Sequence, residues 1–433
     1  MSVMERLKAR RREAILLLVA AIFVAVTLVN LEMSANTGFD LHLGQVMIGF
    51  VVVCLIAHLA LCWLVPLADQ IILPVVAGLN GLGLIMIYRL DLDNNSNMAS
   101  RQVMWSLIGV VLMILTLVVI KDHRSLSKYS YILGLLGLIL LALPMVWPIK
   151  VDADANIWIS IGSFSIQPSE FSKILLLLFF AQLLVTKRAL FTVAGYRFLG
   201  MEFPRLRDLG PVLAVWFVAL VIMAGENDFG PALLLFGTVL GMIYLTTGRA
   251  SWLLIGVVLV AIGGTGVYQV SSKIQARVEN FIDPISNYHG SGYQLSQALF
   301  GMSWGGITGT GLGQGYPYTV PVAHSDFILA AIGEELGLIG LSGVLILFAI
   351  FIQRGMRTAL ITKDSYGKLV ASGLSLTMAI QIFVVVGGIS ALMPMSGLTT
   401  PFMSQGGSSL MANYILVGII LRISNTAHKE MVA

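Results

Sequence analysis

The sequence predicts an all-α polytopic membrane protein with about twelve transmembrane helices, because three observations agree. Hydrophobic residues make up 57% of the chain and charged residues 11%, whereas a soluble domain carries about 25% charge. Apolar windows of spanning length recur along the chain, and basic residues gather in alternate connections between them. We therefore exclude a soluble enzyme and interpret the net charge of +4 as a topology signal, not a nucleic-acid site.

The predicted helices follow from the apolar windows, taken in order along the chain. The basic segment 1–13 precedes the first window, and no small-residue cleavage site follows it. We therefore interpret this window as a retained helix and not as a signal peptide. The expected helix cores are 14–32, 45–65, 71–89, 103–120, 129–147, 170–186, 210–225, 229–246, 251–270, 326–352, 367–391 and 407–424.

The charge distribution predicts an orientation with both termini in the cytoplasm. With the amino terminus inside, most basic residues fall in inner connections, namely Lys121, Arg124, Lys128, Lys187, Arg188, Arg197, Arg205, Arg207, Arg249, Arg354, Arg357, Lys363 and Lys368. The outer connections instead carry acids, namely Asp40, Asp91, Asp93, Asp152, Asp154, Glu226 and Asp228. The long segment 271–325 and Asp326 are then expected outside the cell.

We expect the chemistry in the extracellular loop 271–325, because a polar segment of this length is exceptional in so apolar a chain. It contains Arg277 and a run in which two glycines precede Gln294, a side chain suited to a polyhydroxylated ligand. An amphipathic interfacial helix is the alternative for this part. The Gly-rich run 309–315 lacks the Lys and Ser/Thr of a Walker loop, so a gate or a close-packed turn is expected there.

Acidic side chains gather where this loop returns to the membrane. Asp326, next to His324, is expected at the outer interface, where it can stay ionised and reach a lipid-anchored substrate. Glu334 and Glu335 follow at membrane depth, where a carboxylate must be paired, protonated or hydrated. We expect a structural pair between these glutamates and a basic residue of another helix.

Two further polar groups interrupt apolar helices. Lys173 lies one turn into the helix 170–186 and needs an acidic or phosphate partner, because an unpaired ammonium in the bilayer is costly. Ser169 can cap this helix, and Glu170 suits its positive end. Asp228 lies in a short outer turn, either as a solvated acid at a helix start or as a partner of Lys173 or Arg277.

Taken together and in order, these motifs resemble the SEDS family (shape, elongation, division and sporulation proteins) of the RodA/FtsW type. The resemblance covers about four-fifths of the chain, and only the ordered set of motifs is specific. The matching residues are Gln167-Pro168-Ser169-Glu170 with Lys173, Asp228-Phe229-Gly230, Arg277, Asp283-Pro284, Gly290, Gly292-Tyr293-Gln294, Gly311, Gly313, His324-Ser325-Asp326-Phe327, Gly333-Glu334-Glu335, Gly337, Pro401, Ser404 and Gly406-Gly407-Ser408-Ser409.

The resemblance implies a fold and an activity. It implies a ten-helix core at 71–433, preceded here by a two-helix extension at 1–70, an arrangement similar to that of actinobacterial RodA. It implies a peptidoglycan glycosyltransferase that polymerises lipid II outside the cytoplasmic membrane. It also implies a class B penicillin-binding protein as a partner, with other elongation or division proteins. Asp326 matches the family's essential catalytic candidate.

The sequence departs from the family pattern at several positions. Asn287-Tyr288-His289 replaces a second Asp-Pro, and Ile157 replaces a basic residue. Gln405 replaces a Tyr, and Ser396 stands where FtsW-like members often carry Lys, which favours the RodA type. These departures leave Asp326 unaffected.

The implied chemistry is an inverting displacement that forms a β(1→4) bond from an α-linked donor. Such a step needs a base for the attacking hydroxyl and positive charge near the departing lipid pyrophosphate. Asp326 is the candidate base, and Arg277 and Lys173 are the candidate cations, with Gln294 and His324 expected near the substrate. Glu170, Asp228, Glu334 and Glu335 are expected as supporting residues. A divalent cation, Mg²⁺ or Mn²⁺, is expected to neutralise the diphosphate, with Asp326 as an alternative metal ligand.

Two other functions are compatible with the same residues. A lipid II flippase would also use buried charges and a groove that faces lipid, and a scaffold would only activate the penicillin-binding partner. A transferase makes polymer from lipid II in detergent, where a flippase does nothing. A scaffold's effect would survive replacement of Asp326.

Overall fold

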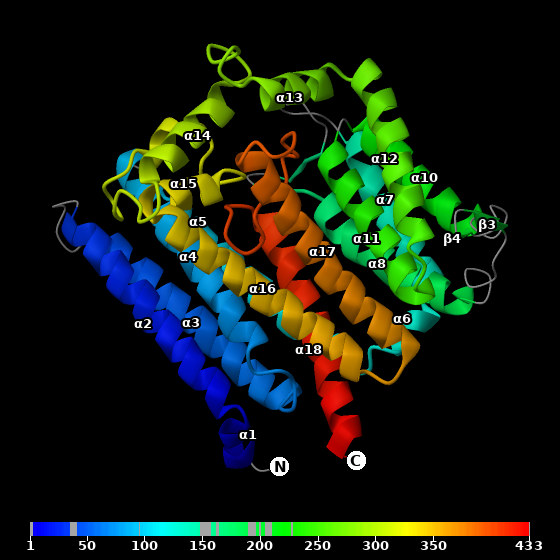
Figure 1. Ribbon diagram of the computed structural model, residues 1–433. Coiled ribbons are helices and arrows are strands. Elements are labelled where there is room, and N and C mark those ends of the chain that lie inside the picture. The colour runs from blue at the N-terminus through cyan, green and yellow to red at the C-terminus, as the bar shows by residue number, and fades with distance from the viewer. Residues whose placement is uncertain are drawn as a thin grey trace. The chain divides into compact units, whose positions relative to one another are not determined.

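The structure is a computed structural model that describes residues 3–34, 41–94, 96–147, 157–161, 164–188, 196–198, 201–203, 210–226 and 228–432. Several charged residues used to predict the orientation, Asp40, Asp152, Asp154, Arg205 and Arg207, lie outside this described part. The described chain is helical apart from two short β-hairpins, so the predicted all-α class is confirmed (Figure 1).

The chain forms two compact units. Unit 1 comprises Met1–Lys121, Arg277–Gly355 and Gln381–Ala433, and unit 2 comprises Asp122–Ala276 and Met356–Ile380. The elements of unit 1 are α1 (Val3–Ala9), α2 (Arg11–Ser34), α3 (Leu41–Leu64), α4 (Ile72–Asn94), α5 (Met98–Val119), α14 (Tyr293–Gly305), η2 (Pro317–Thr319), α15 (Ile328–Glu335) and α18 (Gly407–Val432). Residues of α13 (Ser272–Ile282), α16 (Gly337–Ile361) and α17 (Ser365–Ile389) belong to both units.

Unit 2 contains the remaining helices and the two hairpins. Its helices are α6 (Ser125–Lys128), α7 (Ser130–Val146), α8 (Ser169–Thr186), α10 (Gly210–Gly225), α11 (Phe229–Thr247) and α12 (Ser251–Val270). Strand β1 (Ile159–Ile161) pairs antiparallel with β2 (Phe164–Ile166), with Ile159 opposite Ile166. Strand β3 (Tyr196–Phe198) pairs antiparallel with β4 (Met201–Phe203), with Tyr196 opposite Phe203.

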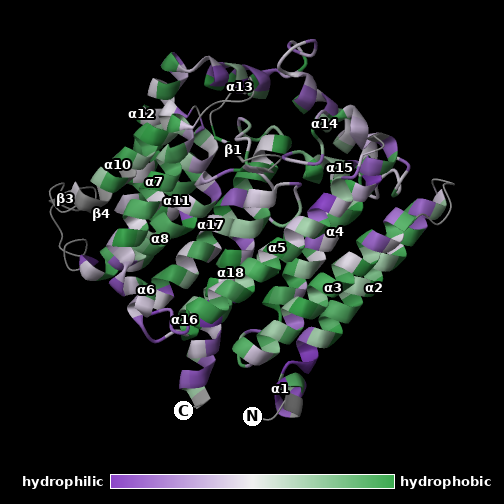
Figure 2. Ribbon diagram, turned by 180° about the vertical axis from the view of Figure 1, so that it is seen from behind, coloured by the Kyte–Doolittle hydropathy of each residue, from purple (hydrophilic) through white to green (hydrophobic). Residues whose placement is uncertain are grey.

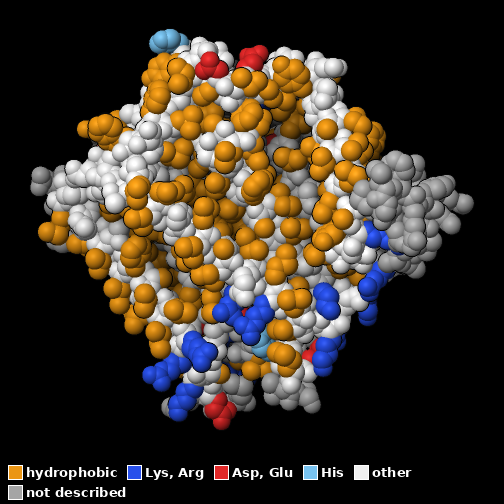
Figure 3. Space-filling model, in the orientation of Figure 1, with side chains coloured by type: hydrophobic (Ala, Val, Ile, Leu, Met, Phe, Trp, Pro, Cys, Tyr) orange, Lys and Arg blue, Asp and Glu red, His pale blue; other side chains and the backbone are white. Residues whose placement is uncertain are grey.

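Ten helices in the described part of the chain are long and apolar enough to cross a membrane. The two other predicted spans correspond to α7, which has 17 residues, and α10, which has 16. Hydrophobic residues line the middle of the long helices, and hydrophilic residues gather toward helix ends (Figure 2). On the face drawn in Figure 3, Lys and Arg of unit 1 gather toward the end of that unit where Figure 1 places the two termini. The protein is therefore a multi-pass membrane protein.

The core of unit 1 is built around α4 and α18, whose spanning windows are 89% buried. Helix α18 packs closely against α5, because Gly109 of α5 lies against the ring of Tyr414. In α4, Asn80 donates a hydrogen bond of 3.1 Å to the carbonyl oxygen of Phe402, in the loop between α17 and α18. Small and polar residues thus allow the close packing that membrane helices favour.

The predicted single helix 326–352 is wrong, because the structure divides it into α15 and α16. Helix α15 ends at Glu335, and α16 begins at Gly337, whose φ of +65° favours glycine. The backbone N–H groups of Thr310 and Gly311 donate to the carbonyl oxygens of Glu334 and Glu335, each at 3.0 Å. The Gly-rich run therefore supplies hydrogen bonds at the break, which fits the expected close-packed turn.

The segment 271–325 contains the helices α13 and α14 and the short 3-10 helix η2, joined by turns. Helix α13 is amphipathic, as expected for an interfacial helix, and it ends at Ile282. Asp283 follows it and accepts hydrogen bonds from the backbone N–H and the hydroxyl of Ser286, which hold its pKa below the ordinary value. Asp283 and Pro284 therefore form a turn at the end of α13.

We predict that Gly83→Ala destabilises the protein by about 1–3 kcal/mol, the range for overpacking a dense core. A Cβ at this position of α4 would lie 2.4 Å from the carbonyl oxygen of Met403, so backbone would have to move. Thermal unfolding in detergent measures the change. The matched control is Gly44→Ala in α3, where a Cβ meets nothing within 4 Å. An unchanged melting temperature for Gly83→Ala would contradict the close packing of α4 on the loop.

Candidate active site

Asp326 lies in the turn that leads into α15, two residues before the helix begins. Burial raises the pKa of this carboxyl above its ordinary value, while its own backbone N–H and the nearby Arg277 guanidinium oppose the rise. A partly desolvated carboxylate with a raised pKa is a stronger base than a hydrated one. Asp326 therefore has the environment of a general base.

Arg277 reaches the same region from α13. Its Nη1 donates a hydrogen bond of 3.1 Å to the carbonyl oxygen of Ser396. The next residue, Gly397, has a φ of +72°, and a Cβ there would lie 2.9 Å from Nη2 of Arg277. The loop between α17 and α18 thus leaves room for the guanidinium and holds it within electrostatic range of Asp326.

The same loop also holds the backbone just before Asp326. The hydroxyl of Ser404 donates a hydrogen bond to the carbonyl oxygen of Ser325. The backbone N–H of Gln405 donates to the carbonyl oxygen of His324 at 2.8 Å. Ser404 is itself oriented by the N–H of Thr400, which donates to its Oγ at 2.8 Å. One loop therefore positions both the candidate base and the candidate cation.

His324 lies half-buried beside the candidate base. Burial lowers its pKa, with the Asp91 carboxylate opposing the change, so the imidazole is neutral at pH 7. Asp91 accepts hydrogen bonds from the backbone N–H groups of Met98 at 2.9 Å and Ala99 at 2.7 Å, and so it fixes the start of α5. A neutral His324 can donate or accept a hydrogen bond but adds no positive charge.

Gln294 supports the segment that precedes Asp326. Its Nε2 donates a hydrogen bond of 2.7 Å to the carbonyl oxygen of Pro321. If Gln294 binds substrate as predicted, it does so while its Nε2 is bonded to Pro321, which leaves its amide oxygen as the acceptor for a ligand.

Glu334 and Glu335 are buried and hold the Gly-rich run. Glu335 forms an ion pair of 2.9 Å with Nε of Arg89 and accepts a hydrogen bond from the N–H of Gly313 at 3.0 Å. Glu334 accepts a hydrogen bond from the N–H of Tyr316 at 2.6 Å. The expected pair with a basic residue of another helix is thus confirmed for Glu335, whereas Glu334 bonds a backbone N–H.

Sequence analysis did not identify Arg89 as a functional residue, although it is the basic partner in this network. Its Nη1 lies 2.5 Å from Asp93, and its Nη2 donates to the carbonyl oxygen of Gly315 at 3.1 Å. A lone arginine at the predicted outer end of an apolar helix, on the side where few basic residues occur, was the available signal.

In unit 2, Lys173 is paired with Glu170 within α8. Its Nζ lies 2.5 Å from Oε2 of Glu170, and both side chains are buried. The acidic partner that Lys173 needed therefore comes from its own helix. The expected cap by Ser169 is wrong, because Pro168 occupies the N-cap position and the Ser169 hydroxyl has no hydrogen-bond partner in the described part of the chain.

Asp228 stands at the N-cap position of α11, where a negative charge is favourable. Burial, together with Asp228, raises the pKa of the neighbouring Glu226 to about 8, so Glu226 is mostly protonated at pH 7. The turn before α11 in unit 2 therefore carries Glu226, a mostly neutral acid, next to Asp228.

Comparison with known families identifies the chain. A sequence model of the family described as "cell cycle protein", which covers FtsW, RodA and SpoVE, matches residues 69–429. The chain belongs to the FtsW, RodA and SpoVE family. The resemblance to SEDS proteins is thereby confirmed, and helices α1 to α3 precede the matched region.

Relatives in this family cover almost the whole chain. The protein "Peptidoglycan glycosyltransferase RodA" of Mycobacterium tuberculosis is 48% identical over 430 residues, which are 98% of this chain and 92% of that protein. A solved structure described as "Structural coordination of polymerization and crosslinking by a peptidoglycan synthase complex" is 24% identical, with a TM-score of 0.68, and covers 83% of this chain and 98% of its own. The crystal structure of Thermus thermophilus RodA is 22% identical, with a TM-score of 0.59, and covers 82% and 96%. Both structures support the fold.

At two positions where the sequence departs from the pattern of the FtsW, RodA and SpoVE family, the residue contacts the candidate site through its backbone. Gln405 replaces the usual Tyr but contacts His324 through its N–H, and Ser396 contacts Arg277 through its carbonyl oxygen. These contacts therefore do not depend on the side chain that departs. A third departure, Tyr288, packs on Tyr293 and accepts a hydrogen bond from Gln297 at 2.7 Å.

We predict that Arg277→Ala raises the pKa of Asp326, because removing a nearby positive charge disfavours the carboxylate. Carbodiimide labelling of the protonated carboxyl, followed by peptide mass spectrometry across pH, measures the midpoint. We expect the midpoint of Asp326 to move to higher pH in this variant. Arg101→Ala, which removes an exposed arginine from α5, is the control and should leave the midpoint in place. A midpoint unaffected by Arg277→Ala would contradict the electrostatic contact.

Proposed function

We propose that this protein is a peptidoglycan glycosyltransferase that polymerises lipid II into glycan strands at the outer face of the cytoplasmic membrane. The identity of 48% over nearly the whole chain to relatives with this activity supports the reaction class. The observation that carries the site is the placement of Arg277 beside a half-buried Asp326 whose pKa is raised by burial.

In the proposed reaction, Asp326 removes the proton of the acceptor hydroxyl as its oxygen attacks the anomeric carbon of the donor. The bond from that carbon to the lipid pyrophosphate breaks, and inversion gives the β(1→4) linkage. The proton remains on Asp326 until it passes to water, and the lipid pyrophosphate leaves with its negative charge. Arg277 offsets that charge, as fixed cations do for departing phosphates.

The other proposed contacts follow from position and chemistry. His324 and Gln294 lie in the segments that lead to Asp326 and are proposed to bind sugar or peptide groups. Lys173 is proposed as a second cation for substrate, with Glu170 setting its orientation. Glu334 and Glu335 are proposed to act at a distance by holding the Gly-rich run. Asp228 is proposed as a supporting acid at the outer turn of unit 2.

A divalent cation, Mg²⁺ or Mn²⁺, is proposed as a cofactor. The described residues contain no group of three or more His, Cys, Asp or Glu suited to a metal. The residues present therefore fit the kind of Mg²⁺ site in which one or two protein carboxylates and the phosphates of the substrate hold the ion. Asp326 is the residue that would share such an ion with the diphosphate, and the ion would supply charge neutralisation.

The proposed topology places both termini in the cytoplasm and Asp326 outside. The gathering of Lys and Arg at the end of unit 1 that carries both termini, with Arg6 and Lys8 in α1 and Lys429 in α18, supports this orientation. The proposed partner is a class B penicillin-binding protein that crosslinks the new strands, together with other elongation or division proteins. The likeness to a structure described as a peptidoglycan synthase complex supports such a partner.

We predict that Asp326→Asn lowers the rate of lipid II polymerisation by about 10²–10⁴-fold, the usual contribution of a general base. The purified protein is assayed in detergent with its penicillin-binding partner, and the polymer is resolved by gel. The control is Glu279→Gln, which neutralises an exposed acid on α13 and should leave the rate unchanged.

The same assay separates the competing functions. A flippase makes no polymer in detergent even as wild type, and a scaffold still yields polymer after Asp326→Asn. Full activity of a folded Asp326→Asn protein would refute the catalytic assignment. Loss of activity with a chelator, restored by Mg²⁺ or Mn²⁺, is expected from the proposed cofactor.

A further inference from the structure

The two N-terminal helices α2 and α3 precede the region that the family model matches, yet buried polar contacts tie them to α4 and the core of unit 1 at both ends. Figure 1 shows α2 and α3 side by side, and α2 also packs against α4. Hydrogen bonds between helices add to their close packing in a membrane. A buried ionisable residue there is costly enough to suggest a function.

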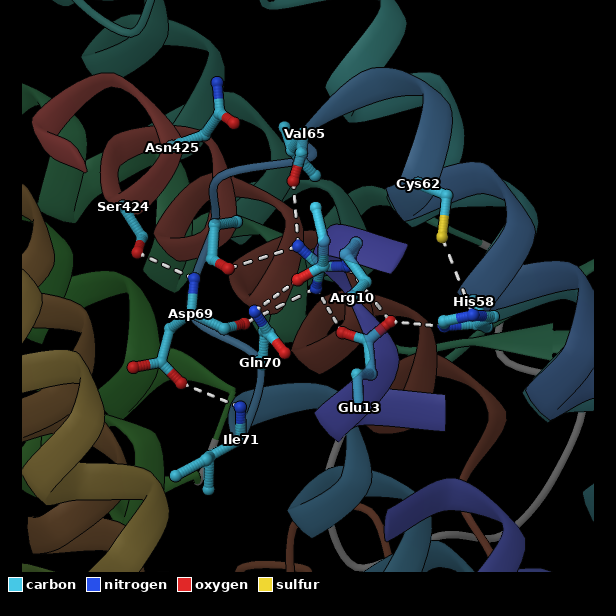
Figure 4. Close-up of polar contacts among 12 residues, drawn as sticks. Arg10, Glu13, His58, Cys62, Val65, Asp69, Gln70, Ile71, Ser424 and Asn425 are labelled. Atoms are coloured by element: carbon cyan, nitrogen blue, oxygen red, sulfur yellow. Dashed lines mark hydrogen bonds and ion pairs between the residues drawn. The ribbon is translucent and has the colours of Figure 1, made fainter. Parts of the chain in front are cut away.

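The inner end of α2 is held by the cluster drawn in Figure 4. Arg10 donates to the carbonyl oxygens of Val65 at 2.9 Å and Ala68 at 3.1 Å, in the turn between α3 and α4, and it forms an ion pair with Glu13. Glu13 also lies 2.6 Å from Nδ1 of His58 on α3. Both charges are fully buried, so this inner cluster holds the start of α2 against α3 and against the turn that precedes α4.

The outer end of α2 makes a second buried contact, this time with α4. The hydroxyl of Tyr88 donates a hydrogen bond of 2.6 Å to Oε2 of Glu32. Glu32 is 2% exposed and Tyr88 is 1% exposed. His42 of α3 stacks on the ring of Tyr88 with centroids 5.6 Å apart, and Ser100 of α5 bonds its Nε2 at 2.9 Å. The extension therefore fixes the orientation of Tyr88.

The next residue on α4 is Arg89, which binds Glu335 and the carbonyl oxygen of Gly315. The Gly-rich run is thus held by the residue that follows Tyr88. The outer end of α2 also touches this run directly, because a Cβ at Gly313 would lie 3.2 Å from Oγ of Ser34. The N–H of Gly313 in turn donates to Glu335. Helix α2 therefore lies beside the Gly-rich run, which Glu335 at the end of α15 holds by a hydrogen bond.

Helix α15 connects this clamp to the candidate base. It has eight residues, with Asp326 just before its first turn and Glu334 and Glu335 in its last. A helix of this length spans about 12 Å and has a continuous ladder of backbone hydrogen bonds. It therefore offers a direct route by which the Gly-rich run, through Glu335, can act on Asp326.

We propose that Glu32 is a positioning residue for the transferase reaction, acting through Tyr88, Arg89 and the Gly-rich run on the helix that follows Asp326. This inference rests on the proposed function and assigns a task to the N-terminal extension. Burying a carboxylate is costly in a helix that the inner cluster already holds. The hydrogen bond from the Tyr88 hydroxyl to Glu32 sets the direction of the outer end of α4.

The test compares Glu32→Leu with Glu32→Gln in the full-length protein. Glutamine keeps an oxygen acceptor for the Tyr88 hydroxyl, and leucine removes it. Thr27→Ala is the control, because the Thr27 hydroxyl donates to the carbonyl oxygen of Phe23 within α2. Each protein is measured for lipid II polymerisation kinetics and for hydrogen exchange of the peptides that cover residues 306–319.

For Glu32→Leu we expect kcat to fall about tenfold or more, because a small misplacement of a catalytic group is costly, with KM changed by less than about threefold. Backbone exchange in the Gly-rich run should become faster in the same variant. Glu32→Gln and Thr27→Ala should match the wild type in both measurements. If Glu32→Leu does not fold, Tyr88→Phe removes the same hydrogen bond while keeping the ring, and the same changes are expected.

Wild-type kcat and unchanged exchange in Glu32→Leu or Tyr88→Phe would overturn the proposal. Equal loss of activity in Glu32→Gln and Glu32→Leu would also overturn it, since the acceptor would then be irrelevant. If the wild-type protein makes no polymer at all, the proposed function fails, whereas the exchange measurement still decides whether Glu32 holds the Gly-rich run.

Discussion

The candidate site depends on the hydrogen bonds from the loop between α17 and α18 to the two residues before Asp326. Ser404 and Gln405 hold the carbonyl oxygens of Ser325 and His324, and the same loop accepts a hydrogen bond from Arg277. Asp326 lies outside any helix, so no helical hydrogen bond fixes its direction. Hydrogen bonds from this loop, instead of bonds within a helix, therefore fix the backbone before Asp326. The loop is itself held by the hydrogen bond from Asn80 of α4 to Phe402.

Unit 1 also contains buried ion pairs. A charge inside a membrane protein must be paired, and removing one partner of a buried pair costs about 3–5 kcal/mol. Arg89, Glu335 and Asp93 form such a network near the candidate site, and Arg10, Glu13 and His58 form one near the N-terminal end of α2. These networks bring together segments that are distant in the sequence, and they restrict how those segments can move.

Much of the fold could be predicted from the sequence, because spanning helices are determined by local apolar length. The limits of α8, α11 and α12 agree with their windows within a few residues, since polar or glycine residues bound them. The break between α15 and α16 could not be predicted in this way. It depends on the N–H groups of Thr310 and Gly311, which come from a distant segment, and on the backbone angle of Gly337.

The candidate site was predicted in part. The motif that contains Asp326 stands out in the sequence, and the need of Glu335 for a basic partner follows from its depth. The identity of that partner, Arg89, does not follow, because it lies 246 residues away. The role of Ser404 was also hidden, because a serine in a Gly-rich motif is typical of close packing.

The most direct test of this account is the turnover of Ser404→Ala compared with Ser404→Thr in lipid II polymerisation. Alanine removes the hydroxyl that holds the carbonyl oxygen of Ser325, and threonine keeps it. We expect kcat to fall about tenfold or more for alanine, with KM little changed, and to recover with threonine. A folded Ser404→Ala protein that turns over at the wild-type rate would contradict it.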